Sequence, residues 1–535
     1  MHGRTVSAHL LAGLMLLYTY LVHAEVQGIP EPGFGMQPVP TFPATWPSAE
    51  SVGFYYVDPG RSAATDRLED GDSADSSGNR YGYPAKPRAT IPSSFTAGSV
   101  VVLSGTFSRW PQRIHMDGNE QSPVWFVGDP QDPPVFSSGE RIFSGQHAIF
   151  DTLTFRDNAM FSLRNKDGYY FYHHAALRNF DMRGTGAMAG SHAAIGISGQ
   201  SSSERASDIL ISNCRISYYG SYTGPTENDF HGIKPSGNVD NVWILNNQVH
   251  HNGGDSIQIG NANIPDETRP SHIYVGSNDF YSNFENDVDI KEADHVIVSS
   301  NNLHESGLSV VVHNNSADIW FLNNRIHDTH QGVDVTSGTN VNFVGNLFYA
   351  VRHDQDAAWD ATSLYARGAA IHSRGGVSAT LVNNTFHDYD IGVQIASVAS
   401  LSMQNNLFSN RTVAQTYDVH LASSSLSPLV DFDFNLFYEP EVATRINWAT
   451  GEGLDVAGIS NLGVCGNCID ATISPMRDPD SQAFALAALS PAMDVGTDSE
   501  VYTRFQVTYG LVLSRDVSGS LRVLGLSLTW GLMKA

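Results

Sequence analysis

The chain has 535 residues, of which 48 are glycine, 10% are aromatic and only 16% are charged. This composition is typical of a turn-rich all-β protein and excludes an intrinsically disordered chain. The formal net charge of −25 excludes nonspecific binding to nucleic acid, because phosphate recognition needs clustered Lys and Arg and the sequence contains no such cluster. An anionic polymer would also be repelled unless a bound cation or a locally basic cleft receives it.

The first 24 residues predict a signal peptide. Arg4 precedes an apolar run over residues 10–21, and Val22-His23-Ala24 resembles a signal-peptidase site. The run is short for a transmembrane span, so an uncleaved anchor is the second interpretation, and no later segment is apolar enough to cross a bilayer. We therefore expect a secreted protein, extracellular or periplasmic, that is monomeric and has no membrane span once the signal is removed.

A Pro-rich stretch over residues 25–51 has little periodicity and predicts an extended linker. Order is expected from residue 52 to residue 494. A short strand, a long polar loop and a strand over residues 99–103 open this part, and the acidic stretch 66–75 of the loop is interpreted as solvated, with cation binding as the alternative.

From Pro123 onward, short runs rich in Val and Ile are broken by Gly, Asn and Ser, which predicts strands rather than helices. The recurring step between Asn pairs is about 22 residues, within the range of solenoid repeats, and longer steps indicate inserted loops. Stacked repeats bring side chains of one register into columns, where Asn amides bond to one another and to the backbone. The predicted column, taken as the second residue of each Asn pair or its equivalent, is Cys214, Asn247, Asp279, Asn302, Asn324, Asn346, Asn384 and Asn406.

The period, the Asn steps and strands such as NDVDIK and LSVVVH resemble the right-handed parallel β-helix proteins, the pectate-lyase-like superfamily with its asparagine ladder. The resemblance covers approximately residues 52–494. It implies an all-β fold, a single-stranded right-handed parallel β-helix with long loop inserts, whose first sheet and preceding loops form a polysaccharide groove. Two inserts, 218–228 and 351–368, match those loops by position. Their aromatic residues either stack on sugar rings or cap the core, and they are Tyr218, Tyr219, Tyr222, Trp359 and Tyr365.

Aligning the strands on their apolar inward residues predicts three outward columns. The inward column is Ile233, Ile259, Ile290, Val312 and Val335. The first outward column is Lys234, Gly260, Lys291, His313 and Thr336, and the second is Gly232, Gln258, Asp289, Val311 and Asp334. The third holds Ser256, Asp287 and Ser309, with Asp255 and Asn286 at the strand entrance. A slip of one residue would exchange the inward and outward faces.

A lyase acting on a uronate polymer needs a base for the proton beside the carboxyl group and positive charge for the resulting anion. Lys serves as a base when nearby cations lower its pKa, and calcium held by Asp oxygens supplies countercharge. Resemblance to calcium-dependent pectate lyases implies these roles here. Lys291 is the predicted base, Lys234 the second choice, and His313 a proton relay or substrate ligand. The predicted calcium (Ca²⁺) ligands are Asp255, Asp287 and Asp289, and the predicted substrate contacts are Gln258, Asp334, Tyr222 and Trp359.

Several alternatives remain open at this point. A glycoside hydrolase would use Asp289 with Asp255 or Asp334 as its two carboxylates. A C5-epimerase shares the proton abstraction of a lyase. A noncatalytic polysaccharide-binding or adhesin-type β-helix would carry these charges as solvated ion pairs. The repeated His304-Glu305, His327-Asp328 and His387-Asp388 pairs are interpreted as structural.

The cysteines and the C-terminus complete the sequence-based expectations. In an exported chain, Cys465 and Cys468 are placed for a local disulfide, and Cys214 is expected to be a buried, inert thiol. Residues 495–535 form a separate C-terminal segment. The preceding SPAMDVG resembles the closing segment of related proteins, but the final LTWGLMKA departs from their D-x-G-A-Y-E finish, which a frameshift would explain.

Overall fold

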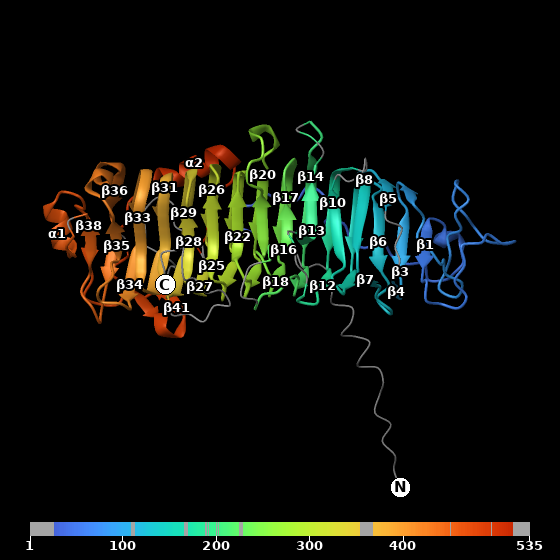
Figure 1. Ribbon diagram of the computed structural model, residues 1–535, viewed down its shortest axis with the longest axis horizontal. Coiled ribbons are helices and arrows are strands. Elements are labelled where there is room, and N and C mark those ends of the chain that lie inside the picture. The colour runs from blue at the N-terminus through green and yellow to red at the C-terminus, as the bar shows by residue number, and fades with distance from the viewer. Residues whose placement is uncertain are drawn as a thin grey trace, which may run out of the picture.

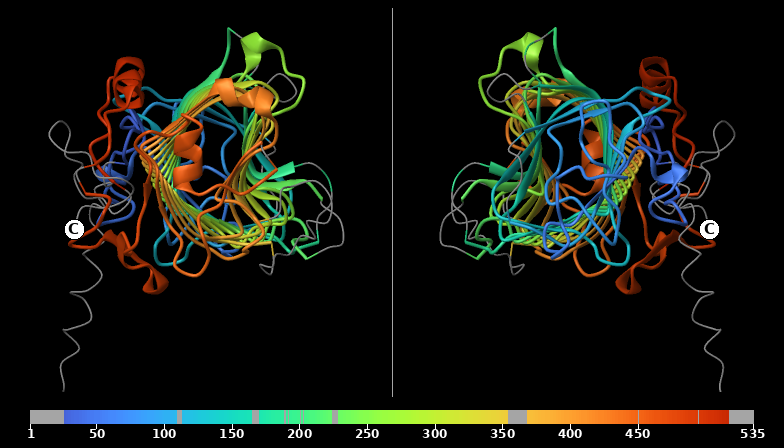
Figure 2. Two further views of the ribbon diagram at one scale, coloured as in Figure 1. Left: turned by 90° about the vertical axis from the view of Figure 1, so that its left-hand side faces the viewer. Right: turned by 90° about the vertical axis from the view of Figure 1, so that its right-hand side faces the viewer.

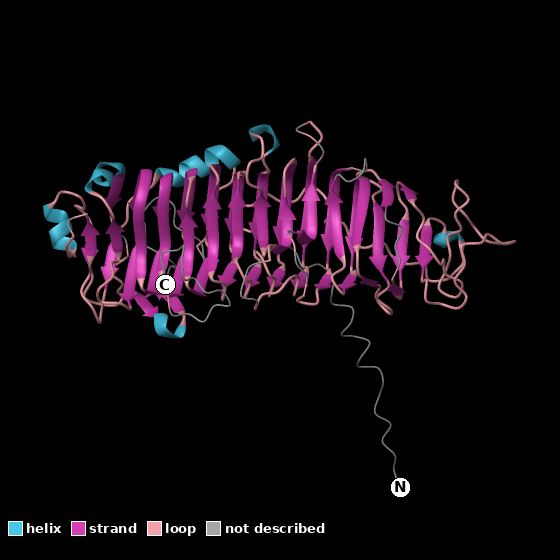
Figure 3. Ribbon diagram, in the orientation of Figure 1, coloured by secondary structure: helices cyan, strands magenta, loops and turns pink. Residues whose placement is uncertain are grey.

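The computed structural model describes residues 26–516, apart from residues 109–112, 165–169, 188, 189, 191, 200, 202, 224–227, 354–367, 450 and 494. The predicted signal peptide, Trp359, Tyr365 and the LTWGLMKA end lie outside the described residues. The described chain forms one long right-handed parallel β-helix, which confirms the predicted fold (Figures 1 and 3). None of its helices is long and apolar enough to span a membrane.

Each coil passes through three faces in turn, which the end-on views show as three sides around one core (Figure 2). The lysine face comprises β2 (Ser94–Thr96), β5 (Arg113–Asp117), β10 (Met160–Arg164), β13 (His192–Ser198), β16 (Phe230–Pro235), β19 (Ile257–Gly260), β22 (Asn286–Lys291), β25 (Leu308–His313), β28 (Gln331–Val335), β35 (Val419–Leu421) and β38 (Ile446–Trp448). The covered face comprises β1 (Phe54–Val57), β3 (Val100–Leu103), β6 (Val124–Gly128), β11 (Phe171–Arg178), β14 (Ala206–Ser212), β17 (Val239–Leu245), β20 (Ser271–Gly276), β23 (Asp294–Ser299), β26 (Ser316–Leu322), β29 (Gly338–Val344) and β36 (Val430–Asp433).

Three long strands bend across both of these faces, namely β8 (Glu140–Asp151), β31 (Ala369–Val382) and β33 (Ile391–Gln404). The third face comprises β4 (Thr106–Phe107), β7 (Val135–Ser137), β9 (Thr154–Arg156), β12 (Asp181–Arg183), β15 (Arg215–Ser217), β18 (Gln248–His250), β21 (Asp279–Tyr281), β24 (Asn302–His304), β27 (Arg325–Thr329), β30 (Leu347–Val351), β32 (Thr385–Tyr389), β34 (Leu407–Arg411), β37 (Leu436–Tyr438) and β39 (Ile469–Asp470). Alternate side chains of all three faces point inward, and they pack into one continuous core from Tyr55 to Cys465.

A column of buried asparagines lies at the turn between the covered face and the third face. Each side-chain amide donates to the carbonyl oxygen of the next at 2.9–3.0 Å from Asn247 onward. At two steps the column holds Asn278 and Asn301 rather than the predicted Asp279 and Asn302. The rule of taking the second residue of each Asn pair was wrong there. The residue before each column member adopts a positive φ, and in these two coils that residue is a serine, Ser277 or Ser300.

The strand register agrees with the predicted alignment at three successive strand pairings and departs from it at one. Ile259 pairs with Ile290, and the pairing continues through Val312 to Val335. Ile233, however, pairs with Ile257 instead of Ile259. Because this slip is two residues long, Lys234 still points outward, but it lies beside Gln258 and not beside Gly260.

The described chain ends pack on two of the three faces. The Pro-rich segment, expected as a linker, is extended but buries Val26, Ile29 and Phe34 on the covered face, where α2 (Glu500–Tyr509) also packs. The antiparallel pair β40 (Met476–Asp478) and β41 (Ala483–Leu486) packs on the third face. The remaining helical elements are α1 (Val456–Asn461) and the 3-10 turns η1 (Ala49–Ser51), η2 (Asp266–Thr268), η3 (Ser424–Leu429) and η4 (Pro479–Ser481).

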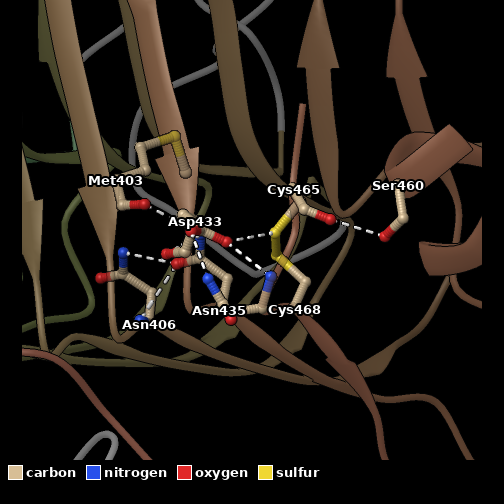
Figure 4. The surroundings of a disulfide bond; sticks show 8 residues. Met403, Asn406, Asp433, Asn435, Ser460, Cys465 and Cys468 are labelled. Atoms are coloured by element: carbon tan, nitrogen blue, oxygen red, sulfur yellow. Dashed lines mark hydrogen bonds between the residues drawn. A yellow bond between two sulfur atoms is a disulfide. The ribbon is translucent and has the colours of Figure 1, made fainter. Parts of the chain in front are cut away.

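The cysteines are placed as the sequence predicts. Cys465 and Cys468 form a disulfide, next to which Asp433 accepts hydrogen bonds from the backbone and side chain of Asn467 at 2.8 Å (Figure 4). Cys214 lies at the start of the asparagine column as a buried thiol whose pKa burial raises to about 12. That thiol is therefore protonated and inert at neutral pH.

Candidate active site

An ion-paired cluster on β22 and β25 joins three of the predicted site residues. Asp289 lies with one carboxylate oxygen 2.6 Å from Lys291 Nζ and the other 2.8 Å from His313 Nε2. Burial opposes the charge of Lys291, but the carboxylates of Asp289 and Asp255 outweigh it and raise the Lys291 pKa. Burial also opposes the charge of Asp289, while His313 and Lys291 outweigh it and lower its pKa. Lys291 is therefore held as a cation.

The pKa of Lys234 on β16 is shifted in the opposite direction. Burial lowers its pKa, and the neighbouring positive charge of Lys291 lowers it further, against the attraction of Asp229 and other carboxylates. Its Nζ donates a hydrogen bond of 3.4 Å to Gln258 Oε1, and the amide of Gln258 donates to the Gly260 carbonyl at 3.2 Å. Gln258, predicted to contact substrate, is only 3% exposed and instead positions Lys234 from below.

A buried histidine that the sequence reasoning missed lies behind the lysines. His231 is fully buried, with Nε2 3.1 Å from Asp229 Oδ1 and Nδ1 3.0 Å from Asp255 Oδ2. Burial opposes its charge, but both carboxylates outweigh it and raise its pKa. Gly254 permits this packing, since a Cβ there would lie 2.8 Å from His231 Nδ1. The sequence signal was available: His231 has the inward register of Ile233, and a polar residue placed inward needs a partner.

The three predicted calcium ligands do not form a common site. Asp255 is fully buried and accepts two hydrogen bonds from Asn286, at 3.1 and 2.7 Å. Asp287 is also fully buried, accepts from Ser306 Oγ at 2.7 Å, and has a pKa that burial raises well above the ordinary value. Asp289 is occupied by Lys291 and His313. Across the described chain, no group of clustered metal-ligating atoms includes any of these three carboxylates.

Further along the same face, a second basic group surrounds Asp334 on β28. Arg374 donates to both Asp334 oxygens, at 3.0 and 2.6 Å, and His372 Nδ1 lies 3.3 Å away. Asp334, predicted to contact substrate, is fully buried beneath Arg374 and His372. Arg374 lies on the bulged part of β31, three coils from Lys291, and no pattern in the sequence indicated that it returns to this column.

The aromatic residues of the first insert divide between two roles. Tyr219 is fully buried, stacks on Phe230 at 5.6 Å and donates to the Ala159 carbonyl at 2.6 Å, so it caps the core. Tyr218 and Tyr222 are half-buried and pack against His251, at 5.1 and 4.5 Å between ring centroids. Their partial exposure at the entrance of β16 leaves Tyr222 as a candidate sugar-stacking residue.

The lysine face continues beyond Lys234 toward the N-terminus. A hollow of about 160 Å³ lies there, and its lining includes Lys234, Ser162, Glu140 and His192. Ser162 donates to Glu140 at 2.7 Å. The hollow thus extends the row of polar groups past the lysine pair.

The repeated His-acid pairs lie on a different face from the lysines. His304 and His327 belong to the third face, where their rings stack between Tyr281 and Tyr349 at centroid distances of 4.4–5.0 Å. His387 follows on β32 of the same face. This column is part of the scaffold, in agreement with the sequence interpretation.

Comparison with known proteins yields likenesses of low identity. No family model matches the chain, and no curated protein matches it. A mannuronic acid-specific polysaccharide family 6 lyase from human gut microbiota aligns with a TM-score of 0.38 and 13% identity, over 64% of this chain and 81% of that one. The PL6 family alginate lyase AlyGC gives 0.46 and 14%, over 66% of this chain and 50% of that one.

A PL6 family polysaccharide lyase from Pseudopedobacter saltans gives a TM-score of 0.43 and 11% identity, over 74% of this chain and 93% of that one. At these values the likeness carries no conclusion about what this chain binds or does. A function for it has to be argued from its own residues.

Proposed function

We propose that the chain is a polysaccharide lyase that cleaves an acidic, uronate-containing polymer by β-elimination. One observation carries the proposal: two lysines lie on the same face, and the pKa of Lys234 is lowered while that of Lys291 is raised. β-elimination needs this pair, a base beside a fixed cation. Groups whose environments drive their pKa values apart are the usual acid and base of a site.

In this proposal Lys234 is the base and Lys291 is the cation. Neutral Lys234 takes the proton next to the uronate carboxyl group, and Lys291 stabilises the negative charge that then spreads onto that carboxylate. His313, beside Asp289, is assigned to return a proton to the leaving glycosidic oxygen. This reverses the order predicted from the sequence, because the ion pair with Asp289 makes Lys291 the poorer base.

Local charge supports an anionic substrate. The chain as a whole carries −25, yet Lys291, His313 and Arg374 lie along one face. The side chains of Lys291, His313 and Arg374 are 22%, 24% and 34% exposed, so they remain accessible from solvent. This row supplies the local positive charge that an acidic protein needs in order to receive an acidic polymer.

The hydrolase alternative is less well supported. Asp289 is paired with His313 and Lys291, which lower its pKa, and both oxygens of Asp334 accept hydrogen bonds from Arg374. Asp255 is buried against His231. A hydrolase needs one carboxyl group that is protonated and can reach the glycosidic oxygen. None of the three proposed carboxylates is placed for that role.

Incubation with pectate, alginate and glycosaminoglycans tests the proposal, with absorbance of the unsaturated product as the readout. We expect that absorbance for one of these polymers. Lys234→Gln should lower kcat at least 100-fold, while Lys86→Gln, which removes a lysine bound to Glu69 in the N-terminal loop, should leave it unchanged. New reducing ends without the absorbance would establish hydrolysis instead, and polymer binding with neither signal would establish a binding protein.

A chelator arm of the same assay tests calcium. Since Asp255, Asp287 and Asp289 do not gather into one ligand set, we expect full activity in EDTA. Loss of activity that added Ca²⁺ restores would mean that other residues hold the ion.

We also propose that the chain is exported and cleaved after Ala24. The Cys465–Cys468 disulfide supports an oxidising compartment. Cleavage there keeps Val26 and Ile29, which are buried on the covered face. N-terminal sequencing of protein recovered from medium or periplasm should start at Glu25, and a mature chain that starts beyond Ile29 would contradict the proposed cleavage site.

A further inference from the structure

Three histidines gather where β8 bends from the lysine face to the covered face and on the adjacent strand β11, away from the lysines. His147 lies on β8, and His173 and His174 lie next to it on β11. One ring nitrogen of each lies within 4.8 Å of those of the other two. The Nδ1 atoms of His173 and His174 are 2.8 Å apart, and the rings of His147 and His174 stack at 4.5 Å.

The backbone is shaped to bring these side chains together. Successive side chains of a strand normally alternate between its two faces. His147 and His174 instead adopt positive φ, 49° and 61°, and the register between β8 and β11 shifts just before His173. Such a bulge re-aims a side chain, so the adjacent His173 and His174 both approach His147 on the same side of the sheet.

The surroundings of the histidines suit a bound cation. His147 Nδ1 is buried and makes no hydrogen bond within the described structure. Asp208 Oδ2, on the next coil, lies 4.0 Å from His174 Nδ1. The ring of Phe34 packs edge-on against His147 and His174, at 5.6 and 5.3 Å, and shields that side of the cluster.

We propose that His147, His173 and His174 bind one divalent transition-metal ion of the Zn²⁺ class, with Asp208 as a fourth ligand or as the acceptor for a metal-bound water. Three imidazoles suit Zn²⁺, Cu²⁺ and Ni²⁺, whereas Ca²⁺ and Mg²⁺ select oxygen ligands. Nitrogens that bind one tetrahedral Zn²⁺ at about 2.0–2.1 Å lie about 3.3 Å from one another. The Nδ1 atoms of His173 and His174 are already closer than that, at 2.8 Å, and the stacked rings of His147 and His174 have to turn for their nitrogens to converge on one ion.

The bound ion is expected to link two neighbouring coils of the β-helix. The ion would join β8 to β11 beside the Pro-rich segment, whose Gly35 and Gln37 carbonyls each accept a hydrogen bond of 2.7 Å from Arg178 of the same strand. Zinc binding should therefore raise the melting temperature, because any ligand specific to the native state stabilises it by mass action.

The test uses the untagged full chain after treatment with EDTA and dialysis. Titration calorimetry with Zn²⁺ should give one site with a Kd below 1 µM, and Co²⁺ should give the intense visible absorption of a four-coordinate ion. His147→Asn and His174→Asn preserve the positive φ, which Asn tolerates, and each should weaken Zn²⁺ binding at least 10-fold. His173→Gln, at a position with ordinary backbone geometry, should do the same.

His295→Asn is the matched control, since His295 has the same positive φ in a coil without a third histidine nearby. It should leave the Zn²⁺ affinity unchanged. The proposal is overturned if wild-type protein binds neither Zn²⁺ nor Co²⁺, or if binding survives in folded His147→Asn and His174→Asn proteins. Because the Co²⁺ spectrum is recorded on the unmodified chain, misfolding of a variant does not leave the question open.

Discussion

At the scale of single residues, the two lysines give a sharp pH test. Lys234 must be neutral to act as a base, so kcat/KM should rise with pH through its pKa, and burial places that rise below the ordinary lysine value of 10.5. Lys291→Gln removes a neighbouring charge that lowers this pKa. We therefore expect the residual activity of the Lys291→Gln variant to rise at a higher pH than the activity of wild type. An unmoved or lower inflection would show that Lys234 is not the titrating base.

His231 makes a separate prediction about stability. Its folded-state pKa is raised, so the pair with Asp229 and Asp255 stabilises the protein fully below the unfolded value of 6.5 and loses that contribution as pH rises through the folded value. The melting temperature of His231→Gln should therefore fall below that of wild type by more at pH 6 than at pH 9. A gap that is constant or widens with pH would mean that His231 is buried neutral.

These residues also mark how far the sequence predicts the site. Lys291, His313 and Asp289 were placed together because parity along a strand fixes which side chains share a face. Which of Lys234 and Lys291 has the lower pKa was not predictable, because that depends on which carboxylate contacts which lysine. Arg374 and the two-residue slip at Lys234 were missed for a related reason: loop length and strand bulges set the register, and neither has a periodic signal.

At the scale of elements, the asparagine column predicts a position-specific cost. Asn324 donates to the Val298 carbonyl and to Asn346, and its Oδ1 accepts from Asn301. Asn324→Ala leaves several of these buried groups unsatisfied, at about 1–3 kcal/mol each. We expect a clear drop in the urea midpoint. Asn302→Ala, one residue after a column member and half-buried, removes hydrogen bonds only to the half-buried Asp279 and His327 and should cost less than Asn324→Ala. Equal losses of stability in the two variants would show that the column asparagines stabilise the protein no more than their neighbours.

The fold itself was predictable because its information is repeated. The same inward pattern recurs in every coil, so an error at one step, as at Asn278 and Asn301, does not propagate to the others. The packing of the chain ends was not predictable in this way. Residues 26–48 and α2 occur once each, and nothing in the repeats indicates which face they cover.

At the scale of the whole molecule, the covered face differs from the lysine face because a chain-end helix, α2, packs on it. Phe505 of α2 is fully buried and packs edge-on against Trp320 at 4.9 Å, while Tyr509 donates to Asp318 at 2.8 Å. Phe505→Ala removes an anchor worth about 3–5 kcal/mol. Because α2 packs on the outside of the β-helix and against the Pro-rich segment, where Gly28 lies next to Phe505, that loss should undock the helix locally rather than unfold the coils.

The expected readouts are a red shift of tryptophan fluorescence, as Trp320 becomes exposed, and faster proteolysis near α2. Circular dichroism of the strands and polymer cleavage should stay as in wild type, since the lysine face lies on other strands. Val507→Ala is the control, because Val507 lies on the same helix and is 81% exposed. Cooperative unfolding of the entire chain by Phe505→Ala would contradict this view and would make the terminal helix part of the β-helix core.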